Sequence, residues 1–170
     1  SIMRGDSLPG GADIFLYRLK DLDSVINAFR QGHFEINSKS YILMGHSLGS
    51  LISILYEGNL PKKDFVKRCE KGLDDFALTN LSKLLQCQLI EIPIPEFKES
   101  LDLKAIIGFN SFGSLIWPTK KSSGIEVPIL FIGGTFDLIT PLLDEQFKLF
   151  VSNQSNKLNR FLVVEGASHF

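Results

Sequence analysis

The 170-residue chain contains two cysteines, one tryptophan and no long run of charge of one sign. Cys69 and Cys87 form neither a CxxC pair nor a cluster with histidine, which argues against a zinc site or a disulfide framework. Both lie in stretches with a helical pattern, so we expect two buried free thiols. A net charge of −1 without a basic cluster argues against nucleic acid as a partner. No segment has 18 unbroken apolar residues, so we expect no membrane span.

The rest of the composition is that of an ordinary globular domain, with 44% apolar and 22% charged residues. A chain of this length can bury a core of its own, and we treat residues 1–170 as one domain. No signal segment is recognisable from Ser1 onward. We therefore leave the compartment open, with the cytoplasm as the default.

Four short apolar runs predict strands that are buried on both faces, as in a parallel sheet: residues 41–44, 105–109, 129–133 and 161–164. Helical patterns at 12–30, 48–56 and 142–151 separate them. This alternation predicts an α/β fold, a mostly parallel sheet flanked by helices. The stretch 61–103 combines one or two helices (64–72 and 74–88) with Pro93 and Pro95. It predicts an extended, irregular connection.

The most specific motif is Gly45-His46-Ser47-Leu48-Gly49, a G-x-S-x-G sequence between a predicted strand and a predicted helix. Glycines allow the close backbone packing that such a turn needs, and the helix N-terminus stabilises negative charge. The motif predicts Ser47 as a nucleophile and the backbone N–H of Leu48 as one oxyanion donor. His46 is expected to be structural or to line the pocket. The alternative is a chance match in a turn that contains glycine and serine.

A serine hydroxyl needs a base to take its proton, and the base needs an orienting acid. His169 is the sole histidine after Ser47 and follows the fourth predicted strand. Asp137 follows the third predicted strand, and catalytic groups of such sheets gather at the carboxyl ends of strands. We therefore predict Ser47 as nucleophile, His169 as base and Asp137 as acid.

Other carboxylates are less well placed for this role: Asp102, Asp144, Glu145 and Glu165. Asp144 and Glu145 open the next predicted helix, where the helix dipole favours negative charge, so we interpret both as first-turn charges. Asp102 precedes its strand and lies at the wrong end of it.

Apolar and polar residues that follow the second predicted strand are candidates for the substrate pocket. Asn110 leaves the strand directly and is expected to face the site. Phe112 and Trp117 come next along the chain. They are as consistent with pocket walls as with core packing, and both alternatives stay open.

Four segments together resemble the α/β-hydrolase superfamily: GHSLGS at 45–50, the Asn110-Ser111 strand exit, IGGTFDLITP at 132–141 and EGASHF at 165–170. They are most similar to its branch of platelet-activating-factor acetylhydrolases and predicted dienelactone-hydrolase-like proteins. The resemblance implies hydrolysis of a small-molecule carboxylic ester by Ser47, His169 and Asp137, without a cofactor or metal. True dienelactone hydrolases use a cysteine where this chain has Ser47, so that label does not identify the substrate.

The sheet of this superfamily usually has about eight strands, whereas four are recognisable here. We therefore expect the C-terminal half of the fold, with strand 41–44 as an apolar edge. The resemblance also implies a small, irregular, cap-like insertion at 61–103, since such folds insert a cap there. The missing N-terminal half would be needed to complete the sheet and to bring the second oxyanion donor. Two other functions stay open, a non-catalytic binding module with this fold and an acyltransferase that uses the same three residues.

Overall fold

The computed structural model describes residues 13–58, 60–61, 63–74, 81–95, 97, 102–118, 124–154 and 156–170. The helices and strands follow one another along the chain as α1 (Asp13–Arg30), β1 (Tyr41–His46), α2 (Leu48–Glu57), α3 (Phe65–Asp74), α4 (Leu81–Cys87), η3 (Gln88–Ile90), β2 (Leu103–Phe109), β3 (Ile129–Gly134), η4 (Leu142–Phe147), α5 (Lys148–Ser152) and β4 (Arg160–Val164). Over the described ranges, no helix has both the length and the apolar character needed to cross a membrane.

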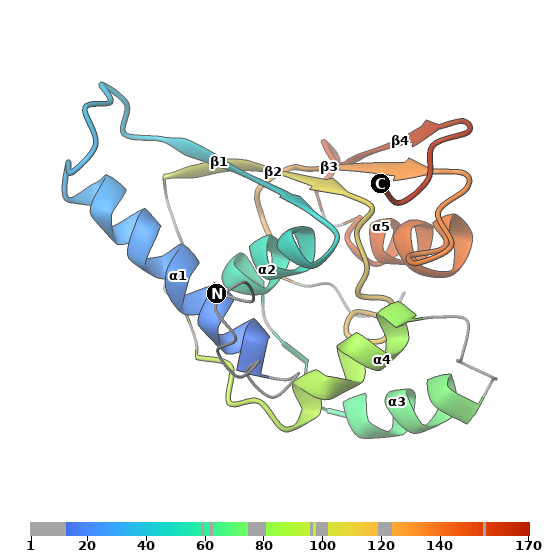
Figure 1. The fold of residues 1–170 in the computed structure, drawn as a ribbon. Coiled ribbons are helices and arrows are strands. Elements are labelled where there is room, and N and C mark those ends of the chain that lie inside the picture. The colour runs from blue at the N-terminus through green and yellow to red at the C-terminus, as the bar shows by residue number, and fades with distance from the viewer. Residues whose placement is uncertain are drawn as a thin grey trace, which may run out of the picture.

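The four strands form one sheet in the order β1-β2-β3-β4, and every neighbouring pair is parallel. Figure 1 shows the strands pointing the same way, so that their carboxyl ends lie along one edge. The predicted α/β fold class with a parallel sheet is confirmed. The loops that leave this edge contain Ser47, Asn110 and Asp137, and the segment after β4 contains His169.

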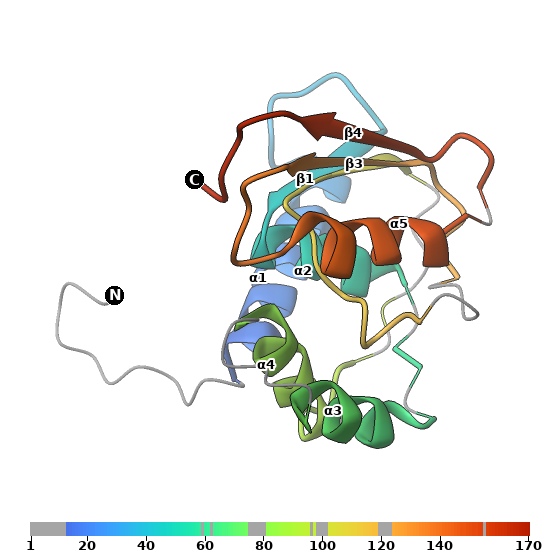
Figure 2. The ribbon, with the colours of Figure 1, turned by 90° about the vertical axis from the view of Figure 1, so that its right-hand side faces the viewer.

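The described helices cover one face of the sheet. Figures 1 and 2 show α1, α2 and α5 on the same side, where α2 packs on β1 and β2 and η4 packs on β3. On the other face, the side chains of Ile42 and Met44 are 54% and 65% exposed. The prediction that strand 41–44 is buried on both faces is therefore wrong. The same prediction is wrong for strand 161–164, in which residues 162–164 are 41–52% exposed. The expected position of strand 41–44 at the edge is confirmed, since among the strands that the structure describes β1 pairs with β2 alone.

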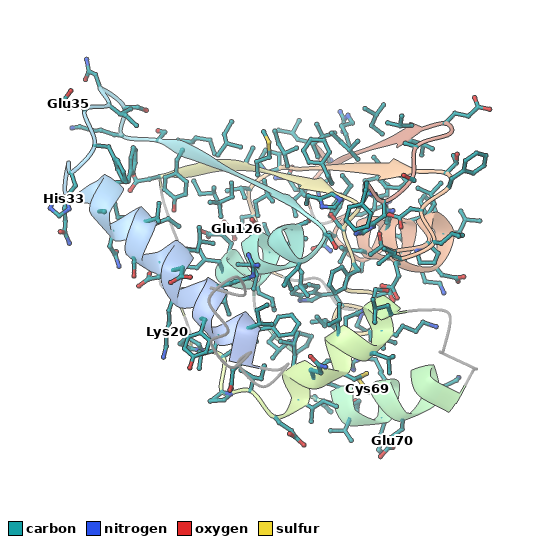
Figure 3. All side chains as sticks on the ribbon, in the orientation of Figure 1. Lys20, His33, Glu35, Cys69, Glu70 and Glu126 are labelled. Carbon is teal, nitrogen blue, oxygen red and sulfur yellow. A yellow bond between two sulfur atoms is a disulfide. The ribbon has the colours of Figure 1, made fainter. Side chains whose placement is uncertain are left out.

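The segment expected to be irregular contains α3 and α4, joined by a disulfide between Cys69 and Cys87. Cys69 is buried between the two helices, as Figure 3 shows. The prediction of two free thiols is wrong because α3 and α4 lie side by side and bring the two Cα atoms to 5.6 Å. A separation of 18 residues gives no sign of this packing.

Candidate active site

Ser47 lies in the tight turn between β1 and α2, with backbone angles φ 53° and ψ −116°. A positive φ is unfavourable for a residue other than glycine and costs about 1–3 kcal/mol. The turn is held by the Ser47 N–H, which donates to the carbonyl of Phe109 at the end of β2, at 2.8 Å. The strained backbone projects the hydroxyl from the carboxyl edge of the sheet.

The two glycines of the motif differ in what they permit. A Cβ on Gly45 would lie 2.2 Å from the carbonyl carbon of Gly49, so any side chain there would collide with the first turn of α2. A Cβ on Gly49 would meet no atom within 4 Å. The steric reason for the motif therefore applies to Gly45 and not to Gly49.

Ser47, His169 and Asp137 meet in one hydrogen-bonded chain. His169 Nε2 lies 3.0 Å from Ser47 Oγ, and His169 Nδ1 lies 2.9 Å from Oδ2 and 3.0 Å from Oδ1 of Asp137. A carboxylate beside Nδ1 favours the tautomer with the proton on Nδ1. The lone pair of Nε2 then accepts the hydrogen bond from the Ser47 hydroxyl.

The carboxylate of Asp137 accepts five hydrogen bonds in addition to that of the histidine. Oδ1 accepts the backbone N–H groups of Ile139 (2.9 Å) and Thr140 (2.8 Å). Oδ2 accepts Asn110 Nδ2 (2.7 Å), Thr140 Oγ1 (2.6 Å) and Gln146 Nε2 (3.1 Å). All of these partners are donors, which matches an ionised acid with two acceptor oxygens.

The charge of Asp137 follows from a balance of opposing influences. Burial has the largest single effect and raises its pKa, because the charged form loses water. Hydrogen bonds from the side chain and backbone of Thr140, then the hydrogen bond and charge of His169, together outweigh burial and leave the pKa below its usual value. The carboxylate is therefore ionised at neutral pH and can stabilise a positively charged imidazole.

Two of the residues predicted to lie near the pocket support this arrangement. Asn110, at a φ of 47°, donates from Nδ2 both to Asp137 and to the carbonyl of Ser168, the latter at 3.2 Å. His46 Nε2 donates to the backbone carbonyl of His169 at 2.7 Å, and the two rings pack with centroids 4.8 Å apart. Both side chains thus hold the segment that carries the imidazole.

The other predicted residues lie as follows. Phe112 and Trp117 are completely buried in the hydrophobic core, which corresponds to the packing alternative. Leu48 is the first residue of α2, and the first N–H groups of a helix have no acceptor within the helix. Among the described residues, no group of three or more His, Cys, Asp or Glu side chains could hold a metal ion.

Two residues that support the acid, Thr140 and Gln146, were not predicted from the sequence. Ile139 and Thr140 follow Asp137 by two and three residues, positions whose backbone N–H groups commonly donate to an Asp side chain at a turn or a helix start, so the sequence could have indicated these two bonds. Gln146 gave no signal. Of the rival acids, Asp144 is exposed and pairs with Lys148 at 2.9 Å.

Glu145 lies in the first turn of η4, as expected. Its burial was not expected: the residue is completely buried and accepts a hydrogen bond from Gln86 Nε2 at 3.0 Å. Gln86 of α4 and Glu145 of η4 are 59 positions apart in the sequence, so the local sequence pattern does not reveal this contact.

Comparison with known proteins yields structural likeness only. No protein-family model and no curated protein matches the chain. An α/β serine hydrolase homologue from Coxiella burnetii matches with a TM-score of 0.51 and 19% identity, covering 98% of this chain and 57% of that one. At this identity the match shows the fold alone. The chain therefore has an α/β fold like that of part of this hydrolase homologue, and spans little more than half of its length.

Two further solved structures are less similar to the chain, with TM-scores below 0.5. Esterase PE8 aligns with a TM-score of 0.43 at 19% identity, over 97% of this chain and 60% of its own. A monoacylglycerol lipase from Paleococcus ferrophilus aligns with a TM-score of 0.45 at 21% identity, over 92% and 67%.

Proposed function

We propose that this chain carries the catalytic residues of a serine-dependent acyl hydrolase that acts on carboxylic esters. Ser47 is the nucleophile, His169 the general base and Asp137 the acid that orients the base. The proposal rests on the line of hydrogen bonds from the Ser47 hydroxyl through both ring nitrogens of His169 to the Asp137 carboxylate. The three residues lie on three separate loops of one sheet edge, so their convergence is not a consequence of proximity in sequence.

In the proposed reaction, Ser47 Oγ attacks the ester carbonyl carbon while His169 Nε2 takes the hydroxyl proton. The carbonyl oxygen becomes negatively charged in the tetrahedral intermediate and faces the N–H of Leu48 at the start of α2. His169 then gives the proton to the leaving alcohol as the ester C–O bond breaks, which leaves an acyl group on Ser47. Water attacks this acyl-enzyme with His169 as base and releases the carboxylic acid, so no cofactor is needed.

The activity is proposed for the complete protein, because the chain spans 57% of the Coxiella protein to which it is similar. Leu48 provides one oxyanion donor, and removing one such donor typically lowers the rate by ~10²–10³. We further propose that segment 61–103 acts as the specificity-determining cap. The resemblance of the motifs to platelet-activating-factor acetylhydrolases and dienelactone-hydrolase-like proteins supports an ester substrate within this class.

Reaction of the complete protein with a fluorophosphonate probe tests the proposal, since the probe bonds covalently to activated serines. Wild-type protein should be labelled, and Ser47→Ala should not. Ser24→Ala is the matched control, because Ser24 is exposed on α1, where its hydroxyl donates to the carbonyl of Lys20 at 2.8 Å. Labelling that persists in Ser47→Ala would contradict the assignment of the nucleophile.

A further inference from the structure

Gln146, on the π-helix η4, is a buried residue that contacts the proposed acid. Its Nε2 donates to Oδ2 of Asp137 at 3.1 Å and to the backbone carbonyl of Thr140 at 2.8 Å. The same Oδ2 lies 2.9 Å from Nδ1 of His169. One carboxylate oxygen of the acid is therefore in contact with both the amide of Gln146 and the imidazole of the proposed base.

The surroundings determine which end of the Gln146 amide faces the acid. The carboxylate of Asp137 and the carbonyl of Thr140 are both acceptors, so the NH₂ group has to point at them. Within the part of the chain that the structure describes, Oε1 of Gln146 is buried without a hydrogen-bond partner. A buried acceptor without a donor is unfavourable, so stability alone does not account for an amide at this position.

The end of β3 leaves room for this amide. A Cβ on Gly133 would lie 2.0 Å from Oε1 and 2.8 Å from Cδ of Gln146. The amide therefore occupies the space that a side chain at position 133 would fill. A glycine permits this close approach of the Gln146 side chain to the strand from which the loop of Asp137 departs.

The residue before Gln146 fixes η4 to two other elements. Oε2 of Glu145 accepts Gln86 Nε2 of α4 at 3.0 Å and lies 3.3 Å from the N–H of Ser114, in the loop after β2. Gln86 and Glu145 are completely buried, so water does not compete for the bond between them. The backbone that carries Gln146 is therefore held in place. Single π-helical turns are frequent at functional sites, which is consistent with this use of two consecutive polar residues.

Gln146 differs from the other donors to the acid in the element that carries it. Ile139 and Thr140 belong to the loop of Asp137 itself, and Asn110 belongs to the loop after β2. Among the described donors to this carboxylate from outside its own loop, Gln146 is the one on a helix. Groups carried on a helix hold a geometry more precisely than groups on loops.

We propose that Gln146 is a positioning residue for the proposed ester hydrolysis, a role that rests on the assignment of Asp137 as the acid. Its NH₂ group holds Oδ2 of Asp137 at the place from which the carboxylate orients the imidazole of His169. The side-chain bonds of Gln146 are to Asp137 and Thr140, so it acts on the chemical step through the acid and not on substrate binding. A displacement of about 1 Å in such an arrangement can lower a rate by ~10²-fold.

Gln146→Met in the complete protein tests the proposal, because methionine has a similar length and shape but no N–H donor. The kcat for hydrolysis of p-nitrophenyl acetate and the rate of fluorophosphonate labelling should fall by about 10-fold, with KM within ~2-fold of wild type. The variant also loses the buried oxygen that has no donor, so the midpoint of urea unfolding should stay close to that of wild type. A purely structural role would instead lower the midpoint and leave kcat of the folded enzyme unchanged.

Gln154→Met is the matched control, because Gln154 is exposed and lies beyond α5, and it should leave kcat within ~2-fold of wild type. Gly133→Ala is a second variant, which displaces the amide of Gln146 without replacing it. It should lower kcat in the same direction as Gln146→Met. Because both changes remove the same hydrogen bond to the acid, combining them should lower kcat no further than the more severe of the two. Equal kcat values for Gln146→Met and Gln154→Met would overturn the proposal.

The NMR resonance of the proton on His169 Nδ1, identified by its loss in His169→Gln, separates this inference from the proposed function because it needs no catalysis. In Gln146→Met this proton should move upfield and exchange faster with water, since the carboxylate that accepts it is held less firmly. If wild type is not labelled but the resonance changes in this way, the hydrolase proposal fails and Gln146 still positions the pair of acid and base. If wild type is labelled while kcat and the resonance are unchanged in Gln146→Met, the role of Gln146 is refuted and the hydrolase proposal stands.

Discussion

Replacing Asp137 by asparagine removes the negative charge beside His169 while keeping almost the same shape. An amide has one acceptor oxygen and one NH₂ group, whereas five donors besides the histidine point at the present carboxylate. An NH₂ at the Oδ1 position faces the N–H groups of Ile139 and Thr140. At the Oδ2 position it faces Asn110 and Gln146 as well as the hydroxyl of Thr140. In either orientation at least two buried donors lose their acceptor.

The expected consequences have two separate magnitudes. Two buried donors without acceptors destabilise the fold by roughly 2–6 kcal/mol, which urea unfolding can measure. In addition, an asparagine no longer favours a proton on His169 Nδ1, so the tautomer that accepts the Ser47 proton is lost. The corresponding change in a serine protease triad lowers kcat by ~10⁴, and this factor equals about 5 kcal/mol of activation free energy.

The assay compares ester hydrolysis and the rate of fluorophosphonate labelling in folded wild type and Asp137→Asn. Asp144→Asn is the control, because Asp144 is an exposed acid nearby that pairs with Lys148. It should leave the rate of hydrolysis within ~2-fold of wild type, as expected for an exposed ion pair away from the reacting atoms. If folded Asp137→Asn kept a rate within ~10-fold of wild type, the tautomer argument would be refuted.

Two further predictions concern the elbow and the disulfide. Gly45→Ala should abolish labelling by the fluorophosphonate probe and strongly lower the midpoint of urea unfolding, because its Cβ would lie 2.2 Å from the Gly49 carbonyl carbon. Gly49→Ala should fold and react with the probe, because a Cβ at that position meets no atom within 4 Å. Reversal of these two outcomes would contradict the steric account of the motif. Replacing Cys69 and Cys87 by serine should lower the free energy of unfolding by about 3 kcal/mol, as estimated from loop closure over 18 residues. Equal urea midpoints for the serine variant and the oxidised wild type would count against a disulfide that stabilises the fold.

The positions of the strands could be predicted because each is a short apolar run in a parallel sheet. Expected strand 129–133 corresponds to β3 (Ile129–Gly134), and expected strand 41–44 to β1 (Tyr41–His46). The convergence of Ser47, Asp137 and His169 followed from the same sheet, since parallel strands bring their carboxyl ends together. Local pattern and chain order were sufficient for this part.

The buried polar contacts and the disulfide could not be predicted from the sequence pattern, because they depend on how the helices pack. The predicted helix 142–151 is a π-helix over Leu142–Phe147 followed by α5, and two consecutive polar residues, Glu145 and Gln146, are buried there. Glu145 bonds to Gln86, 59 positions away, and Gln146 bonds to Asp137 across the loop before the helix, nine positions away. The Cys69–Cys87 disulfide depends in the same way on the contact between α3 and α4. Such pairings need the three-dimensional arrangement, because the sequence distance between partners is arbitrary.

Because the strands are neighbours in the order β1-β2-β3-β4, each can dock on the one made before it as the polypeptide leaves the ribosome. Ser47 is synthesised 122 residues before His169. At about 5–20 residues per second, this interval lasts about 6–24 s. During that time the nascent polypeptide carries its alcohol without an imidazole beside it, so translation itself delays the appearance of a reactive serine until the fourth strand is in place.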